Sequence, residues 1–193
     1  MSSTPRRVGM FGGAFDPPHR AHVALARAAV QQLGLDRLHV LPTGNAWHKT
    51  RTLSPAEDRL AMTRLAFAAL PAAQVDEREL RRTGATYSVD TLRELQAEYP
   101  GAQLYLLMGE DQAASFTGWH AWQEIAALAV LAVAGRGTGE GLARLRALPG
   151  VRVELLQLPQ MPESATDIRA RLTGRQDIGE LLDPAVAGYI ESH

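Results

Sequence analysis

The segment of this sequence that is best suited to chemistry contains a pair of glycines followed within ten residues by two histidines. The segment reads Gly12-Gly13-Ala14-Phe15-Asp16-Pro17-Pro18-His19-Arg20-Ala21-His22. The glycines let the backbone approach a ligand closely, and the start of the helix expected after them offers N–H groups and a partial positive charge. This combination suits a phosphate group. The segment matches neither the G-x-G-x-x-G fingerprint of dinucleotide binding nor a Walker A loop, which would end in G-K-[ST].

His19 and His22 are three residues apart, so they share one face of a helix. Such a pair can ligate a metal, can lie unused on the surface or in the core, or can donate hydrogen bonds to phosphate oxygens. A metal site is disfavoured because the sequence has no cysteine and no obvious third ligand close by. The position directly after the Gly-Gly turn favours phosphate donors, and we predict that both histidines are catalytic.

A second candidate is the basic pair His48 and Lys49. Of the 20 basic residues, Lys49 is the only lysine and the others are arginines. A solvated surface loop is the ordinary interpretation of such a pair. This loop follows a predicted strand and faces the proposed cleft, however, and a flexible ammonium group suits phosphate capture. We therefore predict that the pair binds substrate phosphate.

Alternating strands and helices must position these residues. Continuous apolar runs at 104–108 and 128–134 are typical of strands that helices cover on both faces. Other strands are expected at 6–11, 38–42, 74–80 and 151–158. Helices are expected from His19 to Gly34, from an N-cap at Ser54 toward Leu70, and over 88–99 and 166–172, with a surface loop at 135–141. About six strands alternating with helices predict an α/β fold with a doubly wound, mostly parallel sheet. Ligands bind such sheets beyond the carboxyl ends of the strands.

Composition narrows the class of protein further. The chain has 193 residues, a formal charge of -1, 46% hydrophobic and 21% charged residues, which describes one domain over 1–193. Near-neutral charge disfavours a nucleic-acid partner, and no apolar run approaches the roughly 18 residues that span a bilayer. The lack of cysteine excludes disulfides and a cysteine nucleophile. A cytoplasmic protein with small-molecule substrates is expected.

Four later segments follow the first in a fixed order. They are Trp47-His48-Lys49, then Ala85 to Leu92, then Gly109-Glu110-Asp111 with Trp119 and Trp122, and finally Ser164 to Arg169. The first segment resembles the G-G-x-F-D-P-x-H-x-G-H signature of the (H/T)-x-G-H nucleotidyltransferase superfamily, with Ala21 in place of glycine. The later ones are similar to P-P-H-K, S-Y-T-x-D-T-L, G-x-D with W-x-x-W, and S-S-T-x-I-R of nicotinate-mononucleotide adenylyltransferases. The two prolines before His48 are missing here.

The resemblance implies a Rossmann-like fold and transfer of the adenylyl group of Mg-ATP to nicotinate mononucleotide. It implies four catalytic residues, His19, His22, Lys49 and Arg169. It also implies contacts to ATP from Gly12, Gly13, Ala14, Phe15, Asp16, His19, His22, Gly109, Asp111, Arg136, Ser164, Thr166 and Arg169. Contacts to the mononucleotide are implied for His48, Lys49, Tyr87, Ser88, Thr91 and Trp119. No metal site built by the protein itself is expected, because Mg²⁺ accompanies ATP.

Several of these residues have plain structural alternatives. Ser164 suits a helix N-cap, Trp119 suits a core or an interface, and Arg136 suits a mobile surface loop. Asp111 can bind a ribose hydroxyl or help to order magnesium, and Asp16 can brace the phosphate loop. Another adenylyltransferase, acting on nicotinamide mononucleotide or phosphopantetheine, and a nucleotide-binding regulator without turnover are the alternative functions. A homo-oligomer is compatible with the sequence.

Overall fold

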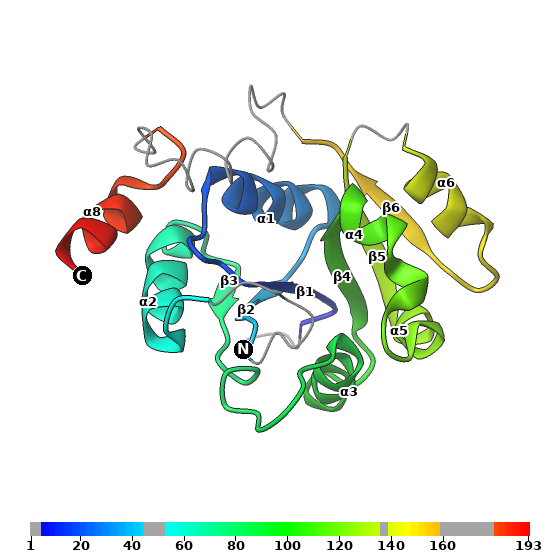
Figure 1. The fold of residues 1–193 in the computed structure, drawn as a ribbon. Coiled ribbons are helices and arrows are strands. Elements are labelled where there is room, and N and C mark those ends of the chain that lie inside the picture. The colour runs from blue at the N-terminus through cyan, green and yellow to red at the C-terminus, as the bar shows by residue number, and fades with distance from the viewer. Residues whose placement is uncertain (1–4, 45–52, 136–138, 159–179) are drawn as a thin grey trace.

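The computed structural model describes residues 5–44, 53–135, 139–158 and 180–193. In this part of the chain, six parallel strands form one sheet in the order β3-β2-β1-β4-β5-β6 (Figure 1). The strands are β1 (Arg7–Gly13), β2 (Arg37–Pro42), β3 (Ala73–Val75), β4 (Gln103–Gly109), β5 (Ala129–Ala134) and β6 (Val153–Leu156). The predicted doubly wound parallel sheet is confirmed.

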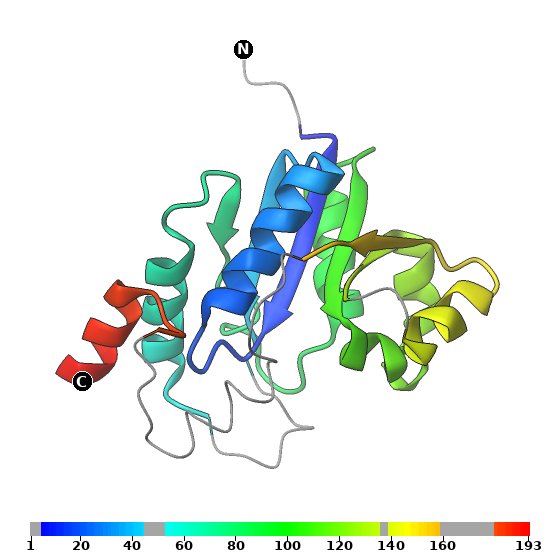
Figure 2. The ribbon, with the colours of Figure 1, turned by 90° about the horizontal axis from the view of Figure 1, so that it is seen from above.

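Helices cover both faces of the sheet, as Figure 2 shows for α1 lying across β1. One face carries α1 (Arg20–Leu33), α2 (Ala56–Phe67) and α8 (Pro184–Ser192). The other carries α3 (Ser88–Glu98), α4 (Glu110–Ala114), the 3-10 turn η1 (Phe116–Gly118), α5 (Trp122–Leu128) and α6 (Glu140–Ala147). Successive strand residues point to opposite faces, so Phe11 packs in the first layer and Met10 in the second. The central strands β4 and β5 therefore read as continuous apolar runs.

The strands β1 and β4 separate before they end. Their pairing stops at Met10 and Leu106. Beyond that point β1 continues to Gly13 beside β2, while β4 continues to Gly109 beside β5. The order of the strands reverses here, because β2 follows β1 on one side and β4 lies on its other side. This is the place in a doubly wound sheet where ligands bind.

Some predicted elements differ from the structure. The strand predicted over 74–80 is limited to β3, because the side chains of Arg78, Glu79 and Arg82 bond to α3 and the segment leaves the sheet edge. The last strand is shorter than predicted, and α2 begins after Pro55 without a side-chain cap from Ser54. The predicted loop over 135–141 is wrong at its end, where Glu140 begins α6. The helix predicted over 166–172 lies outside the described residues.

Candidate active site

The loop after β1 carries the residues predicted to hold phosphate. The backbone of Gly12 is open, since a Cβ built there meets no atom within 4 Å, whereas a Cβ on Gly13 would lie 3.1 Å from the ring of Phe15. Phe15 has a φ of 47°, in the left-handed region that costs side-chain-bearing residues energy. Its ring is buried between Phe11 and Phe67, with centroid separations of 5.4 and 5.8 Å. Core packing thus fixes the loop, and its backbone can face a ligand.

The two histidines cap the start of α1 together. The backbone N–H of His19 donates to Nδ1 of His22 at 3.1 Å, and the two rings stack with centroids 3.7 Å apart. Because Nδ1 of His22 accepts a hydrogen bond, a neutral His22 ring carries its proton on Nε2. The cap therefore fixes the tautomer and makes Nε2 the donor atom of this side chain.

The start of α1 also receives the C-terminal part of the chain. The backbone N–H of Arg20 donates to the carbonyl oxygen of Leu181 at 3.0 Å, so this N–H group of the helix is occupied. Leu181 and Leu182 are buried, and α8 follows them beside α2, as both ribbon views show. The chain thus returns to the phosphate loop after residues 159–179.

Asp16 joins the phosphate loop to the residues that precede α2. Its Oδ2 accepts a hydrogen bond from the N–H of Ser54 at 3.1 Å, which agrees with the predicted bracing role. Arg59 also bonds to this loop, and sequence reasoning missed it. The sequence did contain a signal for Arg59. Arg59 lies three positions before Met62 and four before Thr63, which places this charged residue on the buried face of α2.

The carboxyl end of β4 lies across the separation from the phosphate loop. The N–H of Gly109 donates to the side-chain oxygen of Gln112 at 3.2 Å, and Asp111 is exposed in the first turn of α4. Gly135 ends the neighbouring strand, and a Cβ there would collide with the side chain of Glu110. The chain after β5 is therefore closely packed against α4, the backbone of Gly109 is open, and the side chain of Asp111 is accessible to a ligand.

Aromatic residues gather near the start of α3. The rings of Tyr87 and His120 lie 4.2 Å apart, and Phe116 contacts both Trp119 and Trp122 with centroid separations of 5.8 and 5.9 Å. Phe116 is fully buried, whereas Trp119 is half-buried and His120 is exposed. Trp119 is thus anchored on one side by the core while part of its surface remains accessible. Sequence reasoning missed His120, whose signal was its place between the two tryptophans.

Thr91, one of the predicted mononucleotide contacts, is held inside the polar network beside α3. Its side chain is fully buried, and its hydroxyl donates to Oε1 of Glu79 at 2.8 Å and accepts from Arg82 at 2.7 Å. Its two partners give the hydroxyl a structural role, in which Thr91 supports the segment that leads into Tyr87 and Ser88. The contact of Thr91 with the mononucleotide stays a prediction.

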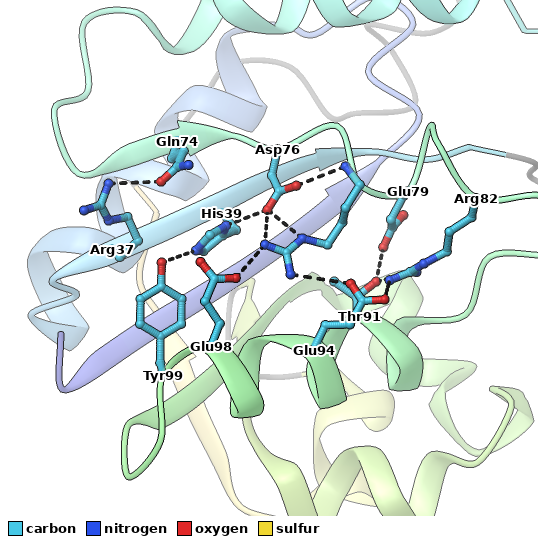
Figure 3. Close-up of polar contacts among 11 residues, drawn as sticks. Arg37, His39, Gln74, Asp76, Glu79, Arg82, Thr91, Glu94, Glu98 and Tyr99 are labelled. Atoms are coloured by element: carbon cyan, nitrogen blue, oxygen red, sulfur yellow. Dashed lines mark hydrogen bonds and ion pairs between the residues drawn. The ribbon is translucent and has the colours of Figure 1, made fainter. Parts of the chain in front are cut away.

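Glu79, the hydrogen-bond partner of Thr91, has a carboxyl group with a strongly perturbed pKa. Glu79 is 3% exposed, and burial raises the pKa of its carboxyl group to about 7 against the hydrogen bond from Thr91 and the charge of Arg82. Arg82 also pairs with Glu94 at 2.7 Å. These contacts attach the segment 76–87 to the side of α3 that faces it (Figure 3).

A second part of this polar network lies toward the end of α3 (Figure 3). His39 of β2 is fully buried between Asp76, 2.8 Å from its Nδ1, and the hydroxyl of Tyr99, 3.0 Å from its Nε2. Arg78 pairs with Asp76 and with Glu98. Burial acts to raise the pKa of Asp76, but the hydrogen bonds from His39 and Arg78 outweigh it and hold that pKa well below its usual value. The network fixes the segment that precedes the aromatic group.

The remaining predicted residues lie outside the described part of the chain. They are His48, Lys49, Arg136, Ser164, Thr166 and Arg169. Among the residues that the structure does describe, no three or more histidine, aspartate or glutamate side chains gather as metal ligands. Within the same residues, no helix has the length and apolar character to span a membrane.

A glycine-containing loop, a histidine-capped helix and a parallel sheet that opens between β1 and β4 define a nucleotide-binding transferase site. The sequence matches the cytidylyltransferase-like family over residues 10–171, and the chain belongs to that family. It is 51% identical to the probable nicotinate-nucleotide adenylyltransferase of Albidiferax ferrireducens, over 97% of this chain and 96% of the relative. It is 40% identical to the protein of that name from Methylibium petroleiphilum, over 100% and 94% of the two chains. Within the family, the chain is thus a member of the nicotinate-nucleotide adenylyltransferases.

Solved structures share the fold at low sequence identity. Nicotinic acid mononucleotide adenylyltransferase of Plasmodium falciparum, complexed with NaAD, superposes with a TM-score of 0.76 at 17% identity, over 97% of this chain and 95% of that one. The same enzyme complexed with APC gives a TM-score of 0.75 at 16% identity, over the same shares of the two chains. At these identities the likeness shows a common fold.

Proposed function

We propose that this protein transfers the adenylyl group of ATP to nicotinate mononucleotide, giving nicotinate adenine dinucleotide and pyrophosphate. Support for the acceptor comes from the named relatives, which share up to 51% of the sequence over nearly its full length. Support for the chemistry comes from one observation above all. The capped pair His19 and His22 stands directly behind the phosphate loop, where β1 and β4 separate.

The reaction is a displacement at phosphorus. An oxygen of the mononucleotide phosphate attacks the α-phosphorus of ATP, a new P–O bond forms, and the bond to the bridging oxygen breaks as pyrophosphate leaves. Such a transfer needs alignment of two polyanions and fixed donors at the transferring group. In this proposal His22 donates from Nε2 to a phosphate oxygen, with the tautomer that its bond from His19 sets.

Further groups hold the two substrates. The open backbone at Gly12, with the neighbouring Gly13, accommodates the ATP phosphates. The predicted roles of Lys49 and Arg169 as cationic phosphate ligands are part of the proposal. Trp119 offers its accessible face to the nicotinate ring. In this proposal the ring carboxylate accepts hydrogen bonds from the backbone at the start of α3, near Tyr87.

Magnesium enters the proposal as the partner of ATP. Mg²⁺ is usually held by substrate phosphates with one or two carboxylates. Asp111, exposed at the carboxyl end of β4, is suited to be one of these or to bind a ribose hydroxyl. The reaction is proposed to run in the cytoplasm, where its small-molecule substrates are found, and the homo-oligomeric state stays a prediction.

The direct test follows pyrophosphate release from purified protein. Mg-ATP is supplied with nicotinate mononucleotide, nicotinamide mononucleotide or phosphopantetheine in parallel reactions. We expect the highest kcat/KM with the nicotinate substrate. Release only with phosphopantetheine would select a different adenylyltransferase, and binding of ATP without release in any reaction would indicate a regulator.

A further inference from the structure

Arg59 of α2 is a buried cation that donates hydrogen bonds to backbone carbonyl oxygens. Its side chain is 3% exposed. Nη1 donates to the carbonyl oxygens of Ala14 and Thr43, each at 2.9 Å, and Nε donates to the carbonyl oxygen of Ser54 at 3.1 Å. Buried carbonyl groups need such donors, since an unsatisfied one is costly.

The three carbonyl groups belong to three separate stretches of chain at the carboxyl edge of the sheet. Ala14 lies in the phosphate loop after β1, Thr43 directly follows β2, and Ser54 precedes α2. Thr43 and Ser54 stand on either side of residues 45–52, the stretch that contains the predicted basic pair. One guanidinium group therefore joins the phosphate loop to the end of β2 and to the residues that precede α2.

Two further hydrogen bonds connect the same stretches without the arginine. The N–H of Thr43 donates to the carbonyl oxygen of Gly13 at 2.8 Å, and the N–H of Ser54 donates to Asp16 at 3.1 Å. The phosphate loop is thus bonded directly to Thr43 and to Ser54, and Arg59 bonds to all three stretches of chain.

We propose that Arg59 is a positioning residue, which fixes the ATP phosphate loop relative to Thr43 after β2 and Ser54 before α2, so that the ATP phosphates are held in line for transfer. The inference rests on the proposed function, because it assigns the phosphate loop to ATP. Arg59 does not touch the substrates in this account, and it acts through the backbone that it holds.

Arginine suits this role better than lysine. Its planar fork presents donors at fixed angles to several acceptors, whereas an ammonium is a single point charge. Burial lowers the pKa of Arg59 and the charge of Asp16 opposes that effect, but a guanidinium group stays protonated at neutral pH. Lysine at this position keeps the charge and loses the geometry of the fork.

The test compares Arg59→Lys with Arg64→Lys, a control on the same helix whose arginine is exposed and pairs with Glu77 at 3.3 Å. The measurements are kcat, KM for each substrate, the Kd of a non-hydrolysable ATP analogue, and Tm. A misplacement of about 1 Å can cost a hundredfold in rate, so we expect kcat of Arg59→Lys to fall by about 10- to 100-fold at 25 °C. Both KM values should rise, and the control should stay within about twofold of the wild type.

A second variant separates positioning from stability. Arg59→Ala removes the side chain, and added guanidinium ion at low millimolar concentration should restore part of its kcat and lower the raised Kd of the ATP analogue. A lower Tm with unchanged kcat and KM in Arg59→Lys would overturn the proposal. Failure of that variant to fold would also overturn it, because the residue would then serve stability.

The two proposals fail in different ways. Wild-type protein that releases no pyrophosphate with nicotinate mononucleotide would defeat the proposed function. The positioning role of Arg59 would still be tested by the Kd of the ATP analogue, which we expect to rise about tenfold in Arg59→Lys and to stay unchanged in Arg64→Lys.

Discussion

Glu79 makes the stability of this protein depend on pH near neutrality. Its carboxyl group is buried, and its pKa is about 7 in the folded chain against 4.5 for an ordinary glutamate. The folded state therefore binds more protons than the unfolded state between these two values, and stability falls as pH rises through that range. Each unit of pKa corresponds to about 1.4 kcal/mol, so the loss between pH 4.5 and pH 7 is about 3 kcal/mol.

The perturbation that isolates this loss is Glu79→Gln. Glutamine keeps an oxygen that accepts the hydrogen bond from Thr91, and it has no charge to bury. The variant and the wild type should be about equally stable near pH 4.5. Above pH 7 the variant should be more stable by about 3 kcal/mol, which for a chain of this size raises Tm by about 6 to 12 °C.

The assay is urea unfolding of both proteins at a series of pH values from 4.5 to 8. Other ionisable groups cancel in the difference between the two proteins at each pH. The difference should grow with pH up to about 7 and then level off. A difference that does not change with pH, or one that moves toward greater stability of the wild type, would refute the burial argument.

Other substitutions probe the site and its packing. Replacing His22 by alanine should lower kcat by about 100- to 1,000-fold, as loss of one donor at a transferring group does, while the lost cap costs only about 1 kcal/mol of stability. Stability collapse would contradict this role. Replacing Trp119 by alanine should raise KM for nicotinate mononucleotide at least about tenfold and leave KM for ATP unchanged, since stacking on a base contributes about 1 to 3 kcal/mol; an unchanged KM for the mononucleotide would argue against stacking. Lys49→Arg should reduce kcat if the compact ammonium matters, and near-normal activity would mean that charge alone suffices. Gly135→Ala should lower the unfolding free energy by only about 1 kcal/mol, because the methyl group meets the flexible side chain of Glu110, and a Glu110→Ala background should remove most of that cost in a thermal unfolding series.

Sequence patterns predicted the sheet well because the signals are local. A strand buried on both faces is apolar at every position, as in β5, and Gly34 ends α1 with a φ of 60° as a glycine after a helix should. The phosphate loop was recognisable for the same reason. Its glycines and histidines are neighbours in the chain.

What the sequence did not reveal depends on partners that are distant in the chain. The stretch 74–80 was predicted as a strand, but β3 ends at Val75, and beyond it Arg78 and Arg82 bond to carboxylates of α3. Arg59 shows the same limit, since its acceptors are backbone groups up to 45 residues away. The helix α4 has five residues, too few for a periodic pattern.

The hydrogen bond between Arg20 and Leu181 has a consequence for synthesis of the chain on the ribosome. A nascent protein grows from its N-terminus at about 5 to 20 residues per second, so the phosphate loop emerges long before its C-terminal partner exists. Through that interval water must accept the hydrogen bond from the N–H of Arg20, which the carbonyl oxygen of Leu181 accepts later. Completion of this turn therefore requires that synthesis has passed residue 181, and a product that stops short of that residue lacks the bond.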